Sequence, residues 1–137
     1  MKFQINTLYT LEALIEIVKN KSDRHFDKSG KEMYVPGNMY AVYISKFSNS
    51  GNMKKYTAVY IGKTVEIDEN NEEIYPNVVV ENDLELWYSC QNFQDVIDLA
   101  YSQKNNASFE EIISCLNHYA EGDDFLDLIE NLRNTPQ

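Results

Sequence analysis

Hydrophobic residues near the start of the chain recur at intervals of three and four positions, at Leu8, Leu11, Leu14, Ile15 and Val18. This spacing is typical of one apolar face of a helix, so we predict a helix from about Leu8 to Lys19. Asn6 or Thr7 can cap its start. The polar stretch from 21 to 31 predicts a loop.

The pattern then changes to alternation, which predicts β-strands. A short strand at 32–35 is ended by Pro36-Gly37. Residues 39–47 and 56–67 alternate around a turn-rich loop, which predicts an antiparallel hairpin. Tyr40, Val42 and Ile44 share one face of the first strand, and Val59, Ile61, Val65 and Ile67 share one face of the second.

Tyrosines mark the opposite face of this hairpin, at positions 43, 56 and 60. Two alternatives remain open for that face. The tyrosines are exposed and form binding anchors, or C-terminal helices cover them and the sheet is a middle layer.

The remaining third of the chain predicts a strand followed by helices. Leu84, Leu86, Tyr88 and Cys90 alternate on one face of a strand, with Trp87 on the other. Asn92 can cap a first helix, and Ser108 with Glu111 forms a capping box for a second. Gly122 ends that helix, and a last short helix carries Phe125, Leu128, Ile129 and Leu132.

These elements predict an α+β fold in a single domain over residues 1–137. We expect an N-terminal helix, an antiparallel sheet of about three to five strands, and two or three C-terminal helices packed on the sheet. The content of hydrophobic residues (43%) and charged residues (25%) is ordinary for a globular protein.

The net charge of −10 is unevenly distributed. Residues 1–65 contain ten Lys/Arg and five Asp/Glu, a net charge of +5, whereas residues 66–137 contain two and seventeen, a net charge of −15. Two explanations of this excess of acidic residues remain open. It serves solubility alone, or it forms a surface complementary to a basic partner. Direct nucleic-acid binding by the acidic half is not expected, because phosphates would be repelled.

Targeting features are not evident in the sequence. The first residues lack the apolar core of a secretory signal, and no run approaches the roughly 20 apolar residues of a membrane span. Cys90 and Cys115 form no CxxC pair and are expected to be buried and reduced. We therefore expect a cytoplasmic protein without membrane contact.

Signatures of catalysis are sparse. His25 and His118 are the two candidate general bases, and Cys115 lies one helical turn from His118, a spacing that any helix offers. The acidic turn from Asp68 to Glu73 lacks the glycine of a calcium loop. The five glycines are scattered, so no phosphate-binding loop is formed. We predict no enzyme activity, no metal site and no cofactor.

The remaining candidates lie on the surface. Carboxylates that follow residue 65 are the side chains expected to meet a basic partner, with Trp87 as an aromatic anchor. The predicted partner-binding residues are Glu72, Glu73, Glu81, Asp83, Glu85, Trp87, Asp123 and Asp124.

A family resemblance bears on the identity of that partner. The matching residues are Gln94-Asp95-Val96-Ile97, Ala100, Ser102-Gln103-Lys104, Ser108-Phe109-Glu110-Glu111, Leu116-Asn117, Tyr119 and Asp123-Asp124-Phe125. This segment resembles an uncharacterised family of small acidic bacterial proteins associated with polymorphic-toxin and contact-dependent inhibition loci. The resemblance implies an immunity protein that binds a cognate toxin, a basic nuclease-type domain, and occludes its active site.

Two other classes of function remain open. The protein is alternatively a non-catalytic regulatory or adaptor module, for example one of phage origin, that binds another basic protein surface. The third alternative is an enzyme with an unfamiliar site, for which His25 and His118 are the candidate residues.

Overall fold

A four-stranded antiparallel sheet lies at the centre of the molecule, with the strand order β1-β5-β4-β8. The computed structural model describes residues 3–33, 39–49 and 51–128. The strands are β1 (Thr7–Thr10), β4 (Ala41–Ser45), β5 (Ala58–Gly62) and β8 (Leu84–Ser89). The predicted α+β class and the antiparallel pairing of β4 with β5 are confirmed.

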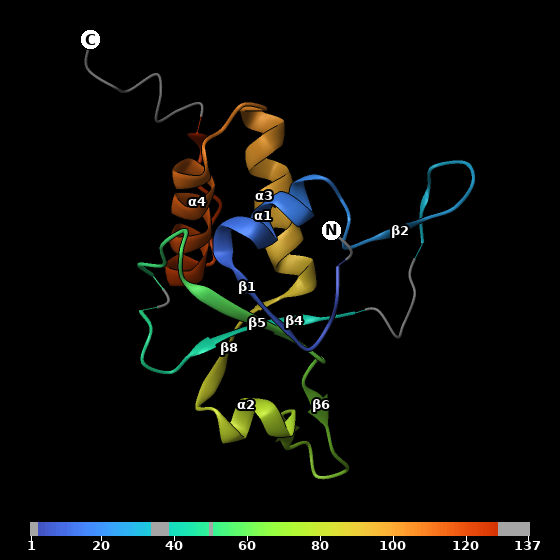
Figure 1. The fold of residues 1–137 in the computed structure, drawn as a ribbon, viewed down its shortest axis with the longest axis vertical. Helices are drawn as coiled ribbons and strands as arrows, with labels where there is room; N and C mark the ends of the chain where they lie inside the picture. Colours follow the sequence, from blue (N-terminus) through green and yellow to red (C-terminus); the bar gives the residue numbers. More distant parts are fainter. Residues whose placement is uncertain (1–2, 34–38, 50, 129–137) are drawn as a thin grey trace.

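Three helices cover one face of this sheet (Figure 1). They are α1 (Leu11–Lys19), α3 (Cys90–Gln103) and α4 (Phe109–Gly122). The main core lies between these helices and the sheet, and its fully buried side chains include Leu14, Phe93, Ile97, Ile112, Leu116, Val42 and Ile61. Of the predicted two or three C-terminal helices, α3 and α4 pack on the sheet.

The opposite face of the sheet is covered by a thinner layer (Figure 1). This layer contains the short hairpin of β6 (Glu66–Ile67) and β7 (Glu73–Ile74), and the one-turn helix α2 (Asn77–Glu81). A second, small core forms here from Ala41, Tyr43 and Val79, with Tyr60, Val65, Tyr75 and Leu84 packed around it. The tyrosine-bearing face is thus covered at Tyr43, but by α2 and not by the C-terminal helices.

The predicted N-terminal helix begins too early. Residues 7–10 form β1, which pairs with β5 through Leu8 and Tyr60, and Leu8 is 66% exposed. The helix starts at Leu11 because the hydroxyl of Thr10 accepts a hydrogen bond from the backbone N–H of Ala13 at 3.2 Å.

The predicted strand over 56–67 is also wrong at its ends. β5 stops at Gly62, where a Cβ atom would lie 2.7 Å from the Tyr60 ring and 3.3 Å from the Tyr43 ring. After this crowded point the chain leaves the sheet. Val65 therefore packs in the second core and not with Val59 and Ile61, while Ile67 in β6 is exposed.

A β-bulge alters the faces of β8. Val42 pairs with Tyr88 and Tyr43 pairs with Leu86, so Trp87 is an extra residue on this strand. Consequently Leu84 packs in the second core while Tyr88 and Cys90 enter the main core, and the prediction that they share one face is wrong. Trp87 is half-buried against Tyr88 and Phe93, with ring centroids 4.8 and 6.1 Å away.

The helix caps were predicted in part. The capping box of Ser108 and Glu111 is confirmed. The first C-terminal helix is capped by Ser89 and not by Asn92, whose backbone N–H donates to the Ser89 hydroxyl. Residues 123–127 are not helical, so the predicted last helix does not begin at Asp123, whereas Leu128 is helical and buried in the main core. Ile129 and Leu132 lie outside the described residues.

A short hairpin of β2 (His25–Phe26) and β3 (Glu32–Met33) projects from one side of the sheet (Figure 1). It interrupts the stretch predicted as a loop. β3 corresponds to the predicted strand at 32–35, of which Tyr34 and Val35, with the following Pro36-Gly37, lie outside the described residues.

Buried polar groups connect the base of this hairpin to α3. The Asp23 carboxylate accepts hydrogen bonds from the hydroxyl of Tyr40 at 2.6 Å and from the amide of Gln94 at 2.8 Å. Arg24 donates two hydrogen bonds to Asp98, at 2.7 and 2.9 Å. Burial, and then the charge of Asp23, raises the pKa of Tyr40, so this hydroxyl remains a hydrogen-bond donor.

None of the helices in the described ranges combines the length and the apolar character that a membrane crossing requires. Both cysteines are buried free thiols, as predicted.

The thin layer should unfold independently of the main core. Val79 is the side chain of α2 that is buried, so Val79→Asp would place a charge in the second core. We expect backbone amides of residues 66–83 to exchange at least about tenfold faster, while those of α3 and α4 change little. Hydrogen exchange measured by mass spectrometry checks this. Equal acceleration in α3 would show that the two layers unfold together.

Candidate functional site

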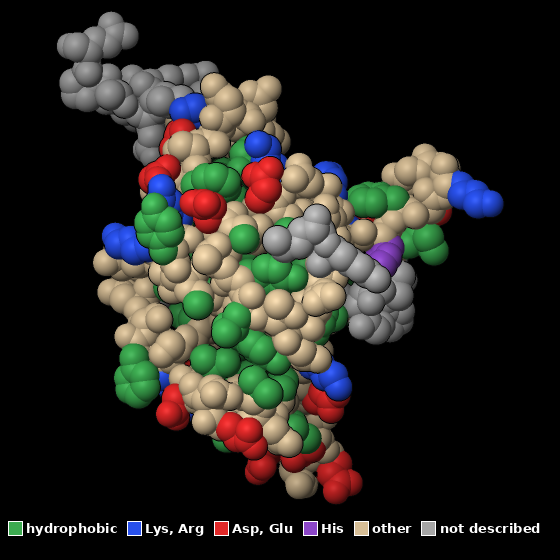
Figure 2. All heavy atoms as spheres, in the orientation of Figure 1, with side chains coloured by type: hydrophobic (Ala, Val, Ile, Leu, Met, Phe, Trp, Pro, Cys, Tyr) green, Lys and Arg blue, Asp and Glu red, His purple; other side chains and the backbone are tan. Residues whose placement is uncertain are grey.

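The thin layer carries a dense concentration of negative charge. We define the acidic lobe as residues 66–83, which comprise β6, β7, α2 and their connections. It contains no Lys or Arg. Its seven carboxylates belong to Glu66, Asp68, Glu69, Glu72, Glu73, Glu81 and Asp83. Figure 2 shows acidic side chains gathered at the end of the molecule where this lobe lies.

The tip of the lobe is a fixed turn between β6 and β7. The Asp68 carboxylate accepts backbone hydrogen bonds from Asn70 at 2.8 Å and from Glu72 at 2.9 Å. Asn71 adopts a positive φ of 62°, a conformation that asparagine tolerates well. Asp68 is therefore occupied in shaping the turn, while Glu69 and Glu72 are exposed around it.

Besides the packing of the second core, hydrogen bonds attach both ends of the lobe to the sheet. The hydroxyl of Tyr43 donates to the carbonyl oxygen of Lys63 at 2.6 Å, where the chain enters the lobe. The backbone N–H of Lys46 donates to the carbonyl oxygen of Asp83 at 2.8 Å, where the chain leaves it. Burial raises the pKa of Tyr43 to about 12, with smaller effects from Tyr75 and Tyr60. Tyr43 thus remains a donor at neutral pH.

Besides Asp68, the carboxylate of Glu73 has a hydrogen-bond partner within the lobe. The hydroxyl of Tyr75 donates to Glu73, and this hydrogen bond raises the pKa of Tyr75. The other oxygen of Glu73 is not used in this bond, and the residue is exposed.

Exposed aliphatic side chains lie among these acids. Ile67 is 60% exposed and Val80 is 64% exposed, and Ile74 and Val78 are exposed by 47% and 39%. Hydrophobic side chains lie next to the acidic end of the molecule in Figure 2. An apolar centre within a charged rim is the usual anatomy of a protein-binding surface.

The charge of the lobe is not neutralised by neighbouring cations. Over the described ranges, no Lys or Arg forms an ion pair with a carboxylate between Glu66 and Glu85. The basic first half instead pairs with acids of the helices, through Arg24 with Asp98 and Lys55 with Glu110. The negative field of the lobe therefore remains available to another molecule.

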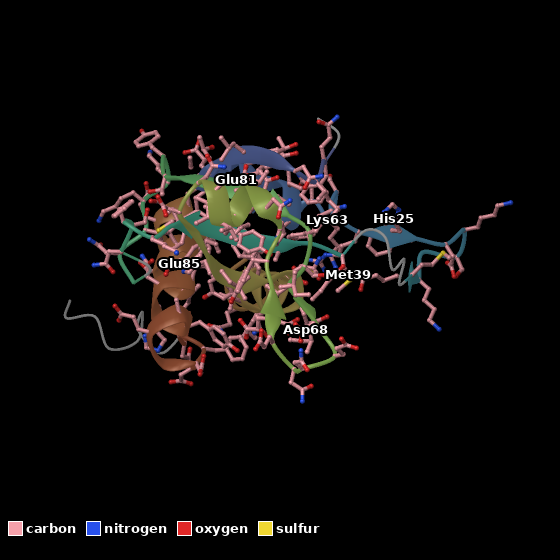
Figure 3. All side chains as sticks on the ribbon, turned by 90° about the horizontal axis from the view of Figure 1, so that it is seen from below. His25, Met39, Lys63, Asp68, Glu81 and Glu85 are labelled. Atoms are coloured by element: carbon pink, nitrogen blue, oxygen red, sulfur yellow. The ribbon has the colours of Figure 1, made fainter. Side chains whose placement is uncertain are left out.

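The structure divides the predicted partner-binding residues into three groups. Glu72, Glu73, Glu81 and Asp83 lie in the acidic lobe, and Glu85 lies on the adjoining strand β8. Figure 3 shows Asp68, Glu81 and Glu85 on the underside of the molecule.

The other three residues lie elsewhere. Trp87 packs on the main core, as described above. Asp123 is the C-cap of α4, and Asp124 lies 3.8 Å from the imidazole of His118, so both are on the side of the sheet that carries the helices.

The exposed aliphatic residues of the lobe were not predicted from the sequence. Ile67 was assigned to the core face of a longer strand, and residues 78–80 were not assigned to a surface. A usable signal was present, because Glu66-Ile67 and Glu73-Ile74 are the same dipeptide on both sides of an acidic, asparagine-rich turn. Such a pattern is typical of a small hairpin.

The Cys115 thiol and the possible metal ligands were the remaining candidates for chemistry. Burial raises the pKa of the Cys115 thiol to about 11, so this sulfur is protonated at neutral pH and is a poor nucleophile. Within the part of the chain that the structure describes, no group of three or more His, Cys, Asp and Glu side chains is arranged to hold a metal ion.

Comparison with known proteins places the lobe inside a sequence family. Residues 29–128 match the family model described as "Domain of unknown function (DUF7716)". No curated protein matches the chain, and no solved structure matches it. The matched range includes the acidic lobe, α3 and α4, and it exceeds half of the chain. The chain therefore belongs to the DUF7716 family of domains of unknown function.

Proposed function

We propose that this protein binds a basic protein partner through the acidic lobe, and that it acts as an immunity protein that neutralises a toxin. The observation that carries the proposal is a set of seven exposed or half-exposed carboxylates that form no ion pair with a Lys or Arg of the described ranges, in a lobe that also exposes aliphatic side chains. The choice of a toxin as the partner rests on the resemblance of residues 84–128 to the family of small acidic bacterial proteins associated with polymorphic-toxin and contact-dependent inhibition loci, which implies an immunity protein.

The mechanism follows from charge and shape. The negative field of the lobe accelerates the encounter with a basic surface, such as the substrate groove of a nuclease-type toxin. On contact, the carboxylates at Glu72, Glu73 and Glu81 pair with Lys and Arg of the toxin. Ile67 and Val80 then exclude water from the centre of the interface. The toxin is inhibited because its substrate can no longer enter.

Co-expression tests the function directly. We expect cells that express the toxin encoded beside this protein to survive when the protein is present. Death of those cells despite soluble protein would refute the immunity function. Recovery of a housekeeping protein as the stoichiometric partner in a pull-down would favour a regulatory or adaptor function instead.

The acidic lobe should carry the electrostatic part of binding. Glu72→Gln, Glu73→Gln and Glu81→Gln together remove three charges from exposed positions, so folding should be unaffected. We expect the dissociation constant for the toxin to rise by roughly tenfold or more, mainly through slower association. Surface plasmon resonance at several salt concentrations measures both rates.

The matched control removes the same charge from the helical side of the sheet, with Asp95→Asn, Asp123→Asn and Asp124→Asn. We expect this triple variant to bind like the wild type and to protect cells. If the control weakens binding and the lobe variant does not, the interface lies at α4 and the assignment to the lobe is wrong.

The exposed aliphatic residues should carry the non-electrostatic part of binding. Ile67→Ser with Val80→Ser removes apolar area that is already exposed in the free protein, so its thermal stability should change little. We expect dissociation from the toxin to become about tenfold faster, with association nearly unchanged. An unchanged dissociation rate would show that the apolar centre is not in the contact.

A further inference from the structure

A basic segment adjoins the acidic lobe at one corner of the sheet. We define the basic loop as residues 46–49 and 51–56, between β4 and β5. It contains Lys46, Lys54 and Lys55 and no Asp or Glu. The backbone N–H of Lys46 donates to the carbonyl oxygen of Asp83 at 2.8 Å, so the loop begins beside the last residue of the lobe. Figure 1 shows the loop at the end of β4, on the left side of the sheet.

The basic loop carries the two most exposed large hydrophobic side chains of the described residues. Phe47 is 87% exposed and Tyr56 is 74% exposed. Aromatic side chains within a polar or charged rim are the usual anchors of protein interfaces. The loop therefore has the composition of a contact surface, with charge opposite to that of the lobe.

Hydrogen bonds hold the basic loop in a fixed conformation. The side-chain amide of Asn117 on α4 accepts from the backbone N–H of Met53 at 2.9 Å and donates to its carbonyl oxygen at 3.3 Å, and the side chain of Met53 is buried. The backbone N–H of Phe47 donates to the hydroxyl of Ser45 at 3.1 Å. A loop that is ordered before binding loses little conformational entropy on binding.

Two of the three lysines of the loop have no acidic partner. Lys46 and Lys54 are exposed, and neither forms an ion pair with an acid in the part of the chain that the structure describes. Lys55 lies 3.6 Å from Glu110, but this pair is largely exposed to solvent and contributes little to stability. Figure 2 shows Lys or Arg and hydrophobic side chains on the left side of the molecule, above its acidic end.

We propose that two copies of this chain associate around a two-fold axis, with the basic loop of each copy against the acidic lobe of the other. Phe47 of one copy then packs against Val80 of the other, and the lysines of the loop pair with Glu81 of the lobe and Glu85 beside it. Because the loop and the lobe are neighbours in each copy, a single two-fold axis makes both contacts at once. The dimer covers part of the surface proposed for the toxin, so a toxin would have to displace the second copy.

The position of the loop favours a second copy over another acidic partner. A nucleic acid or an anionic membrane on the loop would also approach the carboxylates at Glu81 and Asp83, and it would be repelled within a Debye length, about 8 Å at physiological ionic strength. A second copy avoids this repulsion, because its own basic loop faces those carboxylates. The inference does not depend on the toxin-binding function, since both surfaces belong to this chain and the test needs no toxin.

Sedimentation velocity of the purified full chain at increasing concentration tests the proposal. We expect a reversible equilibrium between monomer and dimer. The loop variant, Lys46→Glu with Lys54→Glu, reverses two exposed charges, and the lobe variant, Glu81→Lys with Glu85→Lys, reverses two on the other surface. Each variant alone should raise the dissociation constant of the dimer by roughly tenfold or more, because like charges then face each other.

An equimolar mixture of the loop variant and the lobe variant is the decisive sample. In a mixed dimer the reversed loop meets the reversed lobe, and the unchanged loop meets the unchanged lobe, so opposite charges face each other at both contacts. We expect the mixed dimer to dissociate with a constant within about threefold of the wild-type value. This recovery also distinguishes a lost contact from misfolding, because a misfolded chain would not be rescued.

Two further variants separate the contributions to the contact. Lys28→Glu with Lys31→Glu, at the exposed tip of the β2–β3 hairpin, is the matched control. It changes the net charge as the loop variant does, and it should dimerise like the wild type because the hairpin projects from the opposite side of the sheet (Figure 1). Phe47→Ser leaves the charge unchanged, and we expect a dissociation constant about tenfold higher than that of the wild type.

Four results would overturn the proposal. The first is a chain that remains monomeric up to its solubility limit. The second is a dimer that neither the loop variant nor the lobe variant weakens, and the third is a mixture of these variants that stays monomeric. The fourth is a monomer that binds oligothymidylate or phosphatidylserine vesicles and loses this binding in the loop variant, which would assign the basic loop to a polyanion.

Discussion

The requirement to bury both faces of β4 determines the architecture of this protein. Ala41, Val42, Tyr43 and Ile44 are all buried, so consecutive side chains of this strand need cover on opposite sides of the sheet. Val42 and Ile44 are covered by the three long helices, and Ala41 and Tyr43 by α2 and its neighbours. A large core and a small core follow from one central strand. The acidic lobe is held in place because Tyr43 must be excluded from water.

The two layers on either side of the sheet differ in how their charges are paired. Two cations of the first half of the chain pair with acids of α3 and α4, Arg24 with Asp98 and Lys55 with Glu110. The lobe receives no such partner in the described residues. Part of the negative charge of the helical layer is therefore neutralised by ion pairs, whereas that of the thin layer is not. The two layers consequently differ more in charge than the sequence alone suggests. Solubility alone would not require this arrangement, since acids spread over the whole surface would serve it equally.

Sequence patterns predicted those features that depend on local periodicity. The alternation around Val42 and Val59 was sufficient for the central hairpin, and the capping box at Ser108 was sufficient for the start of α4. The failures have long-range causes. The rings of Tyr43 and Tyr60 leave no room for a Cβ atom at Gly62, the last residue of β5, and the bulge at Trp87 is set by its register against β4. No local rule contains these contacts, so the end of β5 and the position of Trp87 could not be predicted. The hairpin of the lobe, in contrast, had a local signal in its repeated Glu-Ile dipeptide.

The composition of the lobe bears on how it would recognise a partner. Seven carboxylates within residues 66–83 repel one another, and the side chain of α2 that offsets this repulsion by burial is Val79. The free lobe is therefore the part of the described fold whose local stability is expected to be lowest. A basic partner would remove the repulsion and bury Ile67 and Val80 at the same time, so it would stabilise the lobe as it binds. Binding and local folding are then coupled, and the affinity for a partner includes the free energy of ordering the lobe. Substitutions at Val79 that loosen the lobe should consequently weaken binding, even though this buried side chain would not touch the partner.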